Sequence, residues 1–185
     1  MKNFKLPLTV NHSGMSVPYQ RPNDSNSHDY IDSKAHPEQI DDLPEVKDWP
    51  ELKAAIKTIN GFNGLRTLGC GIWRESDPQG RIVVLSYINF CFVVPELRDY
   101  VEPYFGFYHM LGIQLYDATL PDDLKIAVEL KRTGFNRGKV AVGWSMDYDV
   151  WGFGDSVDQA KAVANVAYDH LLSFIKSEWV RDWVQ

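Results

Sequence analysis

The sequence predicts an α+β fold, in which an antiparallel sheet of two β-hairpins carries about three helices, packed mainly on one face. Two observations predict this fold. Two pairs of strand-like segments are each joined by a turn-like sequence, and segments with helical spacing of apolar residues precede, separate and follow these pairs. The expected element order is therefore α-ββ-α-ββ-α, with four to five strands, and such separation of helices from strands is typical of the class.

The first 45 residues differ in composition from the rest of the 185-residue chain. Five of its ten prolines lie there, with few large apolar side chains. Too little apolar surface is available to offset the entropy of ordering the segment. Alternating apolar residues at positions 6, 8 and 10 suit a short edge strand, although Pro7 opposes one. We therefore expect a flexible or draped polar arm at residues 1–45 and a single α+β domain at residues 46–185.

The first helix is expected to begin near residue 48. Asp48 and Glu51 have the spacing of a capping box, and Pro50 is tolerated in a first helical turn. Apolar residues then recur at helical spacing up to Gly61, which suits a helix end. This stripe comprises Trp49, Leu52, Ala55, Ile56 and Ile59.

Residues 65–74 and 81–93 form the first expected hairpin, with proline and glycine in the turn between them. The second strand is apolar on both faces, so we expect it in the middle of the sheet. Cys70 and Cys91 fall about four positions out of register across this pair, or ~13 Å along the strand. That separation is too great for a disulfide, so we expect two free thiols and a reducing compartment.

The second expected hairpin joins residues 124–131 to residues 140–150. The first strand alternates apolar and mostly charged side chains, and the second strand returns with a matching apolar face. Joining the two apolar faces requires a loop of odd length, most simply residues 134–138. This register sets Asp147 opposite Lys125.

Two further helices complete the expected fold. An aromatic-rich helical segment runs from residue 96 to about residue 111. The last helix begins with a capping box made by Ser156 and Gln159, and Asp158 suits the first turn, where negative charge is favourable. Its apolar stripe continues to about residue 183.

The order of these elements resembles that of type III secretion chaperones, which are small, acidic and dimeric. The resemblance concerns the order of helices and hairpins alone. It implies a homodimer whose bound partner is non-globular.

Composition and charge restrict the expected partners. The chain has 19 basic and 25 acidic residues, and the net charge of −6 opposes non-specific binding to nucleic acid or to anionic membranes. It suits a basic protein partner. No apolar run has the length of a membrane span or a signal peptide, so we expect a cytoplasmic protein that binds neither nucleic acid nor membrane. We expect no cofactor.

The first functional hypothesis is a non-catalytic protein-binding module. It would be an acidic inhibitor of a toxin-like or nuclease-like partner, in the manner of an immunity protein or an antitoxin. An acidic run from Glu38 to Glu51, the surplus of aromatic residues and the lack of an intact catalytic motif support this hypothesis. The residues expected to contact the partner are Glu38, Asp41, Asp42, Glu45, Trp151 and Phe153.

Two alternatives remain open. The first is a small metal-assisted hydrolase or transferase, because Asp147 and Asp149 share one face of a strand and Asp155 follows, and carboxylate oxygens suit divalent cations. A cross-strand pair with Lys125 and a helix start at Asp155 explain the same residues without a metal. The second is a dimeric, secretion-chaperone-like protein. The sequence leaves the oligomeric state open, a dimer included.

Overall fold

The computed structural model describes residues 5–18, 30–135, 142–178 and 180–181. The described part of the chain contains five strands and six helices, one of them a 3-10 helix. In chain order they are β1 (Leu8–Ser16), the 3-10 helix η1 (Pro37–Asp42), α1 (Pro44–Lys47), α2 (Pro50–Gly61), β2 (Leu65–Ser76), β3 (Ile82–Phe92), α3 (Pro95–Arg98), α4 (Glu102–Asp117), β4 (Leu124–Gly134), β5 (Val142–Gly154) and α5 (Val157–Lys176).

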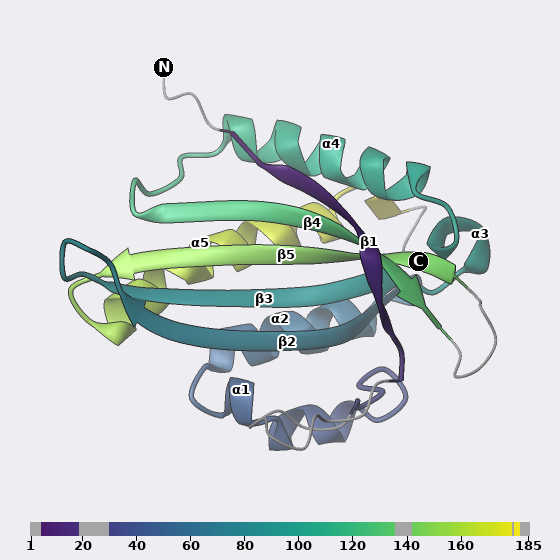
Figure 1. Ribbon diagram of the computed structural model, residues 1–185, viewed down its shortest axis with the longest axis horizontal. Helices are drawn as coiled ribbons and strands as arrows, with labels where there is room; N and C mark the ends of the chain where they lie inside the picture. The colour runs from purple at the N-terminus through teal and green to yellow at the C-terminus, as the bar shows by residue number, and fades with distance from the viewer. Residues whose placement is uncertain (1–4, 19–29, 136–141, 179, 182–185) are drawn as a thin grey trace.

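The strands form one mixed sheet in the order β1-β4-β5-β3-β2 (Figure 1). The two predicted hairpins, β2–β3 and β4–β5, are antiparallel, and β3 also pairs antiparallel with β5. Strand β1 pairs with β4 in parallel. The α+β class is therefore confirmed, while the prediction of a purely antiparallel sheet is wrong because a strand from the N-terminal segment joins its edge.

Strand β1 comes from the segment that we expected to be a polar arm. Leu8 lies opposite Val128 and Val10 opposite Leu130, so the alternation at positions 8 and 10 continues the apolar pattern of β4. Pro7 precedes the strand, and its carbonyl oxygen still accepts the backbone N–H of Val128 at 2.9 Å. A proline at this position therefore removes no ladder hydrogen bond that the edge strand needs.

The helices cover one face of the sheet. Figure 1 shows α2 and α5 behind the strands, with α4 along the upper border. Helix α5 packs against β5 and β3, and α2 packs against β2. The core between these layers is rich in aromatic rings that meet edge to face, as Phe107 does with Phe90 at 5.7 Å and with Phe174 at 4.9 Å. No helix in the described part of the chain is long and apolar enough to cross a membrane.

One of the two predicted capping boxes is present in part, because Ser156 caps α5 while the side chain of Gln159 accepts the backbone N–H of Asp155 rather than that of Ser156. In α5, the side chain of Ser156 accepts the backbone N–H of Gln159 at 3.2 Å, as predicted. Helix α2 has no such cap, because it begins at Pro50 with Trp49 in the capping position. Trp49 is fully buried and donates its indole N–H to Asn165 of α5 at 2.7 Å. The packing of this ring, rather than a polar cap, sets where the helix begins.

The register of the second hairpin differs from the prediction. Lys125 lies opposite Trp151, and Asp147 lies opposite Glu129. The predicted pair of Asp147 with Lys125 is therefore wrong by four residues. The reason is that Gly134 lies opposite Val142, so the midpoint between the paired strands falls two residues later in the chain than in the loop 134–138 that we assumed.

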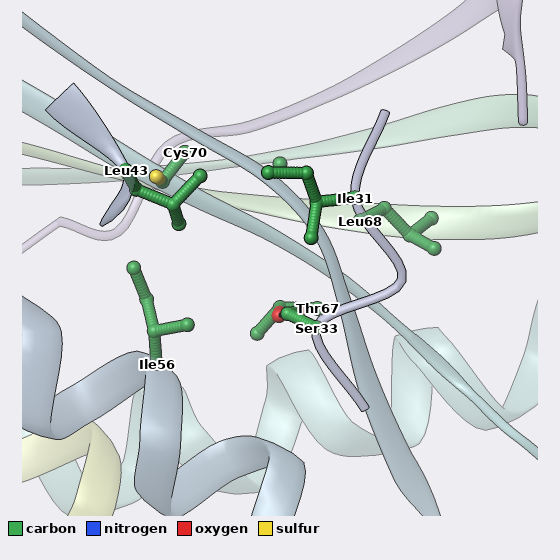
Figure 2. A pocket seen from close by; sticks show the side chains of 8 residues that line it. Ile31, Ser33, Leu43, Ile56, Thr67, Leu68 and Cys70 are labelled. Atoms are coloured by element: carbon green, nitrogen blue, oxygen red, sulfur yellow. The ribbon is translucent and has the colours of Figure 1, made fainter. Parts of the chain in front are cut away.

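A small cavity separates the N-terminal segment from the sheet. It holds about 20 Å³, room for about one water molecule, and Figure 2 shows the thiol of Cys70 among its lining side chains. Ser33 and Thr67 close one side through a hydroxyl contact of 2.8 Å, and the amide of Asn60 donates to both. These bonds attach the segment around residue 33 to β2.

The two cysteines are free, as predicted, and burial raises the pKa of both thiols to about 12. We expect each native thiol to react with a disulfide reagent at pH 8 roughly a thousandfold more slowly than an exposed cysteine, because the thiolate is the reactive species. Stopped-flow labelling checks this, with the chain in denaturant as the control. Fast labelling of Cys70 in the native protein would contradict the structure.

Candidate functional site

The face of the sheet opposite the helices carries a cluster of polar and aromatic side chains. Side chains alternate between the two faces of a strand, so the odd-numbered residues of β5 point away from α5. We call the cluster the open-face cluster. It comprises Tyr87 and Asn89 of β3, Glu129 and Lys131 of β4, and Asp147, Asp149 and Trp151 of β5.

Asp147 is the best-compensated carboxylate of the cluster. It is 3% exposed, forms an ion pair with Lys131 and accepts the side-chain amide of Asn89. Burial raises its pKa even so, against the effect of Lys131. The same lysine lies 3.1 Å from Glu129, whose carboxylate also accepts the amide of Asn11 at 3.1 Å. One ammonium group therefore serves two carboxylates.

Asp149 differs from its neighbour. It is half-buried between its cross-strand partners Tyr87 and Ala127, and it makes no hydrogen bond or ion pair within the described part of the chain. Burial, and then the charge of Asp147, raise its pKa to about 7. This carboxyl group therefore exchanges its proton near neutral pH, and its ionised form lacks a counter-charge of its own.

Asp155 does not join Asp147 and Asp149. It lies beyond the end of β5, six residues after Asp149 or ~20 Å along an extended chain, and it is exposed. Its backbone N–H donates to the side chain of Gln159 at 2.8 Å, at the start of α5. Among the residues that the structure describes, no group of three His, Cys, Asp or Glu side chains is arranged to hold a metal ion.

The predicted acidic contact residues lie on η1 and α1. Glu38 and Asp42 are exposed, and Glu45 is half-buried. Asp41 is exposed but lies 2.7 Å from Lys57 and 3.3 Å from Lys53 of α2. The hydrogen bond from Lys57 lowers the pKa of Asp41. The charge of Asp41 is therefore balanced within the protein by Lys53 and Lys57.

Trp151 and Phe153 lie on the open face, two residues apart. Phe153 is buried, with the guanidinium of Arg81 at 5.0 Å and the ammonium of Lys125 at 4.9 Å from its ring centre. Trp151 is half-buried. Strand β5 extends to Gly154, so both rings lie on the same side of one strand.

Helix α4 exposes a continuous apolar stripe that the sequence did not single out. Phe105 is 40% exposed, Ile113 47% and Tyr116 60%, and His109 is exposed between them. Their spacing places them on one side of the helix. A different side of α4 faces the core through Tyr104, Phe107, Leu111 and Leu115. We call the exposed stripe, with Tyr108 and Gly112, the α4 surface.

The α4 surface contains a hollow of about 290 Å³. Its lining consists of Leu6, Tyr108, His109, Gly112, Ile113 and Tyr116. The hydroxyl of Tyr108 donates to the carbonyl oxygen of Leu6 at 2.7 Å, which attaches the chain before β1 to the helix. Glu102 and Asp117, the first and last residues of α4, are exposed at its two ends. The surface is thus apolar in the middle and acidic at both ends.

Helical spacing alone would have revealed the α4 surface. Residues 105, 109, 113 and 116 fall on one stripe and residues 104, 107, 111 and 115 on another, so the helix is apolar on more sides than a single core contact needs. Comparison of the chain with models of protein families, with curated proteins and with solved structures gives no match. The function is therefore inferred from the α4 surface and the open-face cluster.

Proposed function

We propose that this protein is a non-catalytic protein-binding module whose α4 surface binds a basic protein. The observation that carries the proposal is the apolar stripe of Phe105, Ile113 and Tyr116 on a helix whose core-facing side is already occupied. Large exposed rings next to a hollow are typical anchors of protein interfaces. A helix face of this kind binds a complementary apolar surface.

The charge of the chain supports a basic partner. The net charge is −6, and Glu102 and Asp117 are exposed at the two ends of the stripe. Neither makes an ion pair within the described residues. Acidic groups at the border of an apolar contact accelerate association with a basic partner and disfavour acidic ones. An apolar side chain ringed by lysine or arginine is the partner surface that fits.

Inhibition of a toxin-like or nuclease-like protein is the role that we propose for this binding. Proteins that act on nucleic acid carry basic surfaces, so a small acidic module can cover such a surface. In this role Asp41 contributes less to the attraction of a basic partner than expected from the sequence, because Lys53 and Lys57 compensate its charge. Binding of a partner through the α4 surface requires no catalytic group.

The test compares two lysine substitutions. Ile113→Lys places a charge in the middle of the α4 surface, whereas Trp73→Lys places one at a 54% exposed ring on the edge strand β2. We expect the tagged wild-type chain to capture one stoichiometric basic protein from native lysate. Trp73→Lys should capture it equally, and Ile113→Lys should lose at least about 90% of it, since removing a buried anchor costs more than ~1.4 kcal/mol.

Three outcomes would overturn the proposal. The first is equal capture by Ile113→Lys and wild type, which would place the contact elsewhere. The second is a captured protein that is acidic. The third is self-association, with light scattering giving a mass near twice 21.2 kDa for the wild type and a monomer for Ile113→Lys. That result would make a second copy of the chain the occupant of the α4 surface.

A further inference from the structure

Asn89 has a buried acceptor that lacks a donor. Its side chain is 1% exposed, and its Nδ2 donates to Ser145 at 3.2 Å and to Asp147. Its Oδ1 accepts nothing from the described residues. Buried side-chain oxygens in native proteins nearly always accept a hydrogen bond, so an orphaned one needs an explanation. The Nδ2 of the amide faces Asp147, and the unpaired Oδ1 belongs to the same amide of the open-face cluster, so a donor bound beside it would satisfy it.

The open-face cluster also lacks positive charge. Glu129, Asp147 and Asp149 are three carboxyl groups, and Lys131 is the one ammonium group among them. Lys131 is occupied by Glu129 and Asp147, so Asp149 remains without a partner among the described residues. Burial is the main cause of its raised pKa of about 7, and the charge of Asp147 adds to it, while Lys131 acts in the opposite direction. The missing component is therefore both a donor and a cation.

Aromatic rings flank Asp149 on two sides. Tyr87 lies directly across from it on β3, and Trp151 lies two residues along β5. Tyr87 stacks on Trp73 with ring centres 5.5 Å apart. The stack depends on Gly71, since a Cβ atom there would lie 2.5 Å from the Tyr87 ring. Faces of tyrosine and tryptophan rings attract organic cations.

A hollow of about 570 Å³ adjoins this site at Trp151, the one member of the open-face cluster in its lining. It lies at the edge of β4, before β1 begins to pair there. Its lining consists of Lys5, Pro7, Leu124, Lys125, Ile126, Ala127 and Trp151. Ala127 is the cross-strand partner of Asp149, and its small side chain leaves the carboxyl group half-buried rather than covered. Because Trp151 and Asp149 are neighbours on one face of β5, a ligand lying on Trp151 is adjacent to Asp149, and Lys5 and Lys125 also line the hollow.

We propose that the open-face cluster binds an organic cation of the guanidinium or alkylammonium class. The N–H groups of the ligand donate to Asp149 and to Oδ1 of Asn89, which are diagonal neighbours ~7 Å apart. Its carbon skeleton lies against Trp151. A guanidinium fits best, because it is planar, charged and carries five donors. This site is separate from the α4 surface, so it does not depend on the proposed protein partner.

Binding of two probes to the purified full-length chain tests the proposal by calorimetry at pH 8. Agmatine represents a free small cation, and the capped peptide Ac-Gly-Arg-Gly-NH2 represents an arginine of another protein. We expect one equivalent of at least one probe to bind. Asp149→Asn should weaken binding at least about tenfold, because a charge-assisted hydrogen bond is lost. Asp155→Asn removes the same charge outside the cluster and should leave binding unchanged.

The pH dependence gives a second readout. The charged and titratable groups around Asp149 are Asp147, Glu129, Lys125, Lys131 and Tyr87, with Lys5 in the adjoining hollow. Since the pKa of Asp149 is about 7, the cation must displace a proton below that pH, and binding should weaken between pH 8 and pH 6. Binding of agmatine alone identifies a free cation as the ligand, whereas binding of the peptide identifies an arginine side chain.

Failure of both probes to bind wild type at millimolar concentration would overturn the cation site. Equal binding by wild type and Asp149→Asn would overturn it too. Neither result bears on the α4 surface, because calorimetry uses no protein partner. Conversely, loss of partner capture by Ile113→Lys leaves the agmatine result unaffected.

Discussion

Gly152→Ala should destabilise the protein by at least about 3 kcal/mol, which would lower Tm by roughly 6–12 °C for a chain of this size. Gly152 lies in β5 where α5 crosses the sheet most closely. A Cβ atom there would overlap the carbonyl oxygen of Ala160 and lie 3.0 Å from the backbone nitrogen of Ala164. Backbone atoms of a helix cannot rotate away as a flexible side chain can, so α5 must move off the strand.

Gly61→Ala is the matched control. Gly61 is the last residue of α2, and nothing lies within 4 Å of a Cβ atom placed there. This substitution should leave stability unchanged or raise it by about 0.5 kcal/mol, because alanine loses less backbone entropy on folding than glycine. Urea unfolding measures the free energy of unfolding of Gly152→Ala, Gly61→Ala and wild type, and so tests both expectations. A Gly152→Ala variant as stable as wild type would mean that α5 does not contact β5 as the structure has it.

Asp149→Asn should raise the free energy of unfolding at pH 8 by about 2 kcal/mol. Its pKa is about 7 in the folded protein and near 3.8 in the unfolded chain. The raised value means that the folded state disfavours the ionised form. The full shift is equivalent to about 4 kcal/mol, and we halve it because water screens a half-buried group.

The sign of the pH dependence follows from the same pKa values. Below about pH 4 the carboxyl group is protonated in both states, so it has no effect on stability. As pH rises through the range 4 to 7, the unfolded chain ionises first, and Asp149 increasingly destabilises the folded state. The stability difference between Asp149→Asn and wild type should therefore grow from pH 4 to pH 7 and stay constant above.

Urea unfolding at pH 4.5, 6 and 8 measures this difference, with Asp155→Asn as the variant that removes a charge outside the cluster. A difference that does not change with pH would show that Asp149 has an ordinary environment in the folded protein. An increase of this difference with pH would show that the ionised side chain of Asp149 destabilises the protein when no ligand is bound. A bound cation would remove that cost.

Much of the fold was predictable because the signals are local. The capping box at Ser156 and Gln159 and the apolar stripe of α5 depend only on residues that are close in sequence. The same is true of the turns in the hairpins. The register of β4 on β5 was not predictable, because alternation fixes a strand's face but not the residue at which the turn between the strands is centred.

The candidate sites were predictable only in part, for a similar reason. Asp147 and Asp149 share a face of one strand, which alternation shows. Asn89 and Glu129 join them from neighbouring strands, and their positions depend on pairing between residues far apart in sequence. Strand β1 also depends on such pairing, because its polar residues gain a partner only at the edge of β4.

Site-specific photo-cross-linking tests the central claim, that the α4 surface contacts a partner, most directly. Tyr116→p-benzoylphenylalanine places the cross-linker at a 60% exposed position of the α4 surface, and Trp73→p-benzoylphenylalanine places it on β2. We expect one covalent product with a basic protein from position 116 and none from position 73. A product from position 73, with none from position 116, would contradict it.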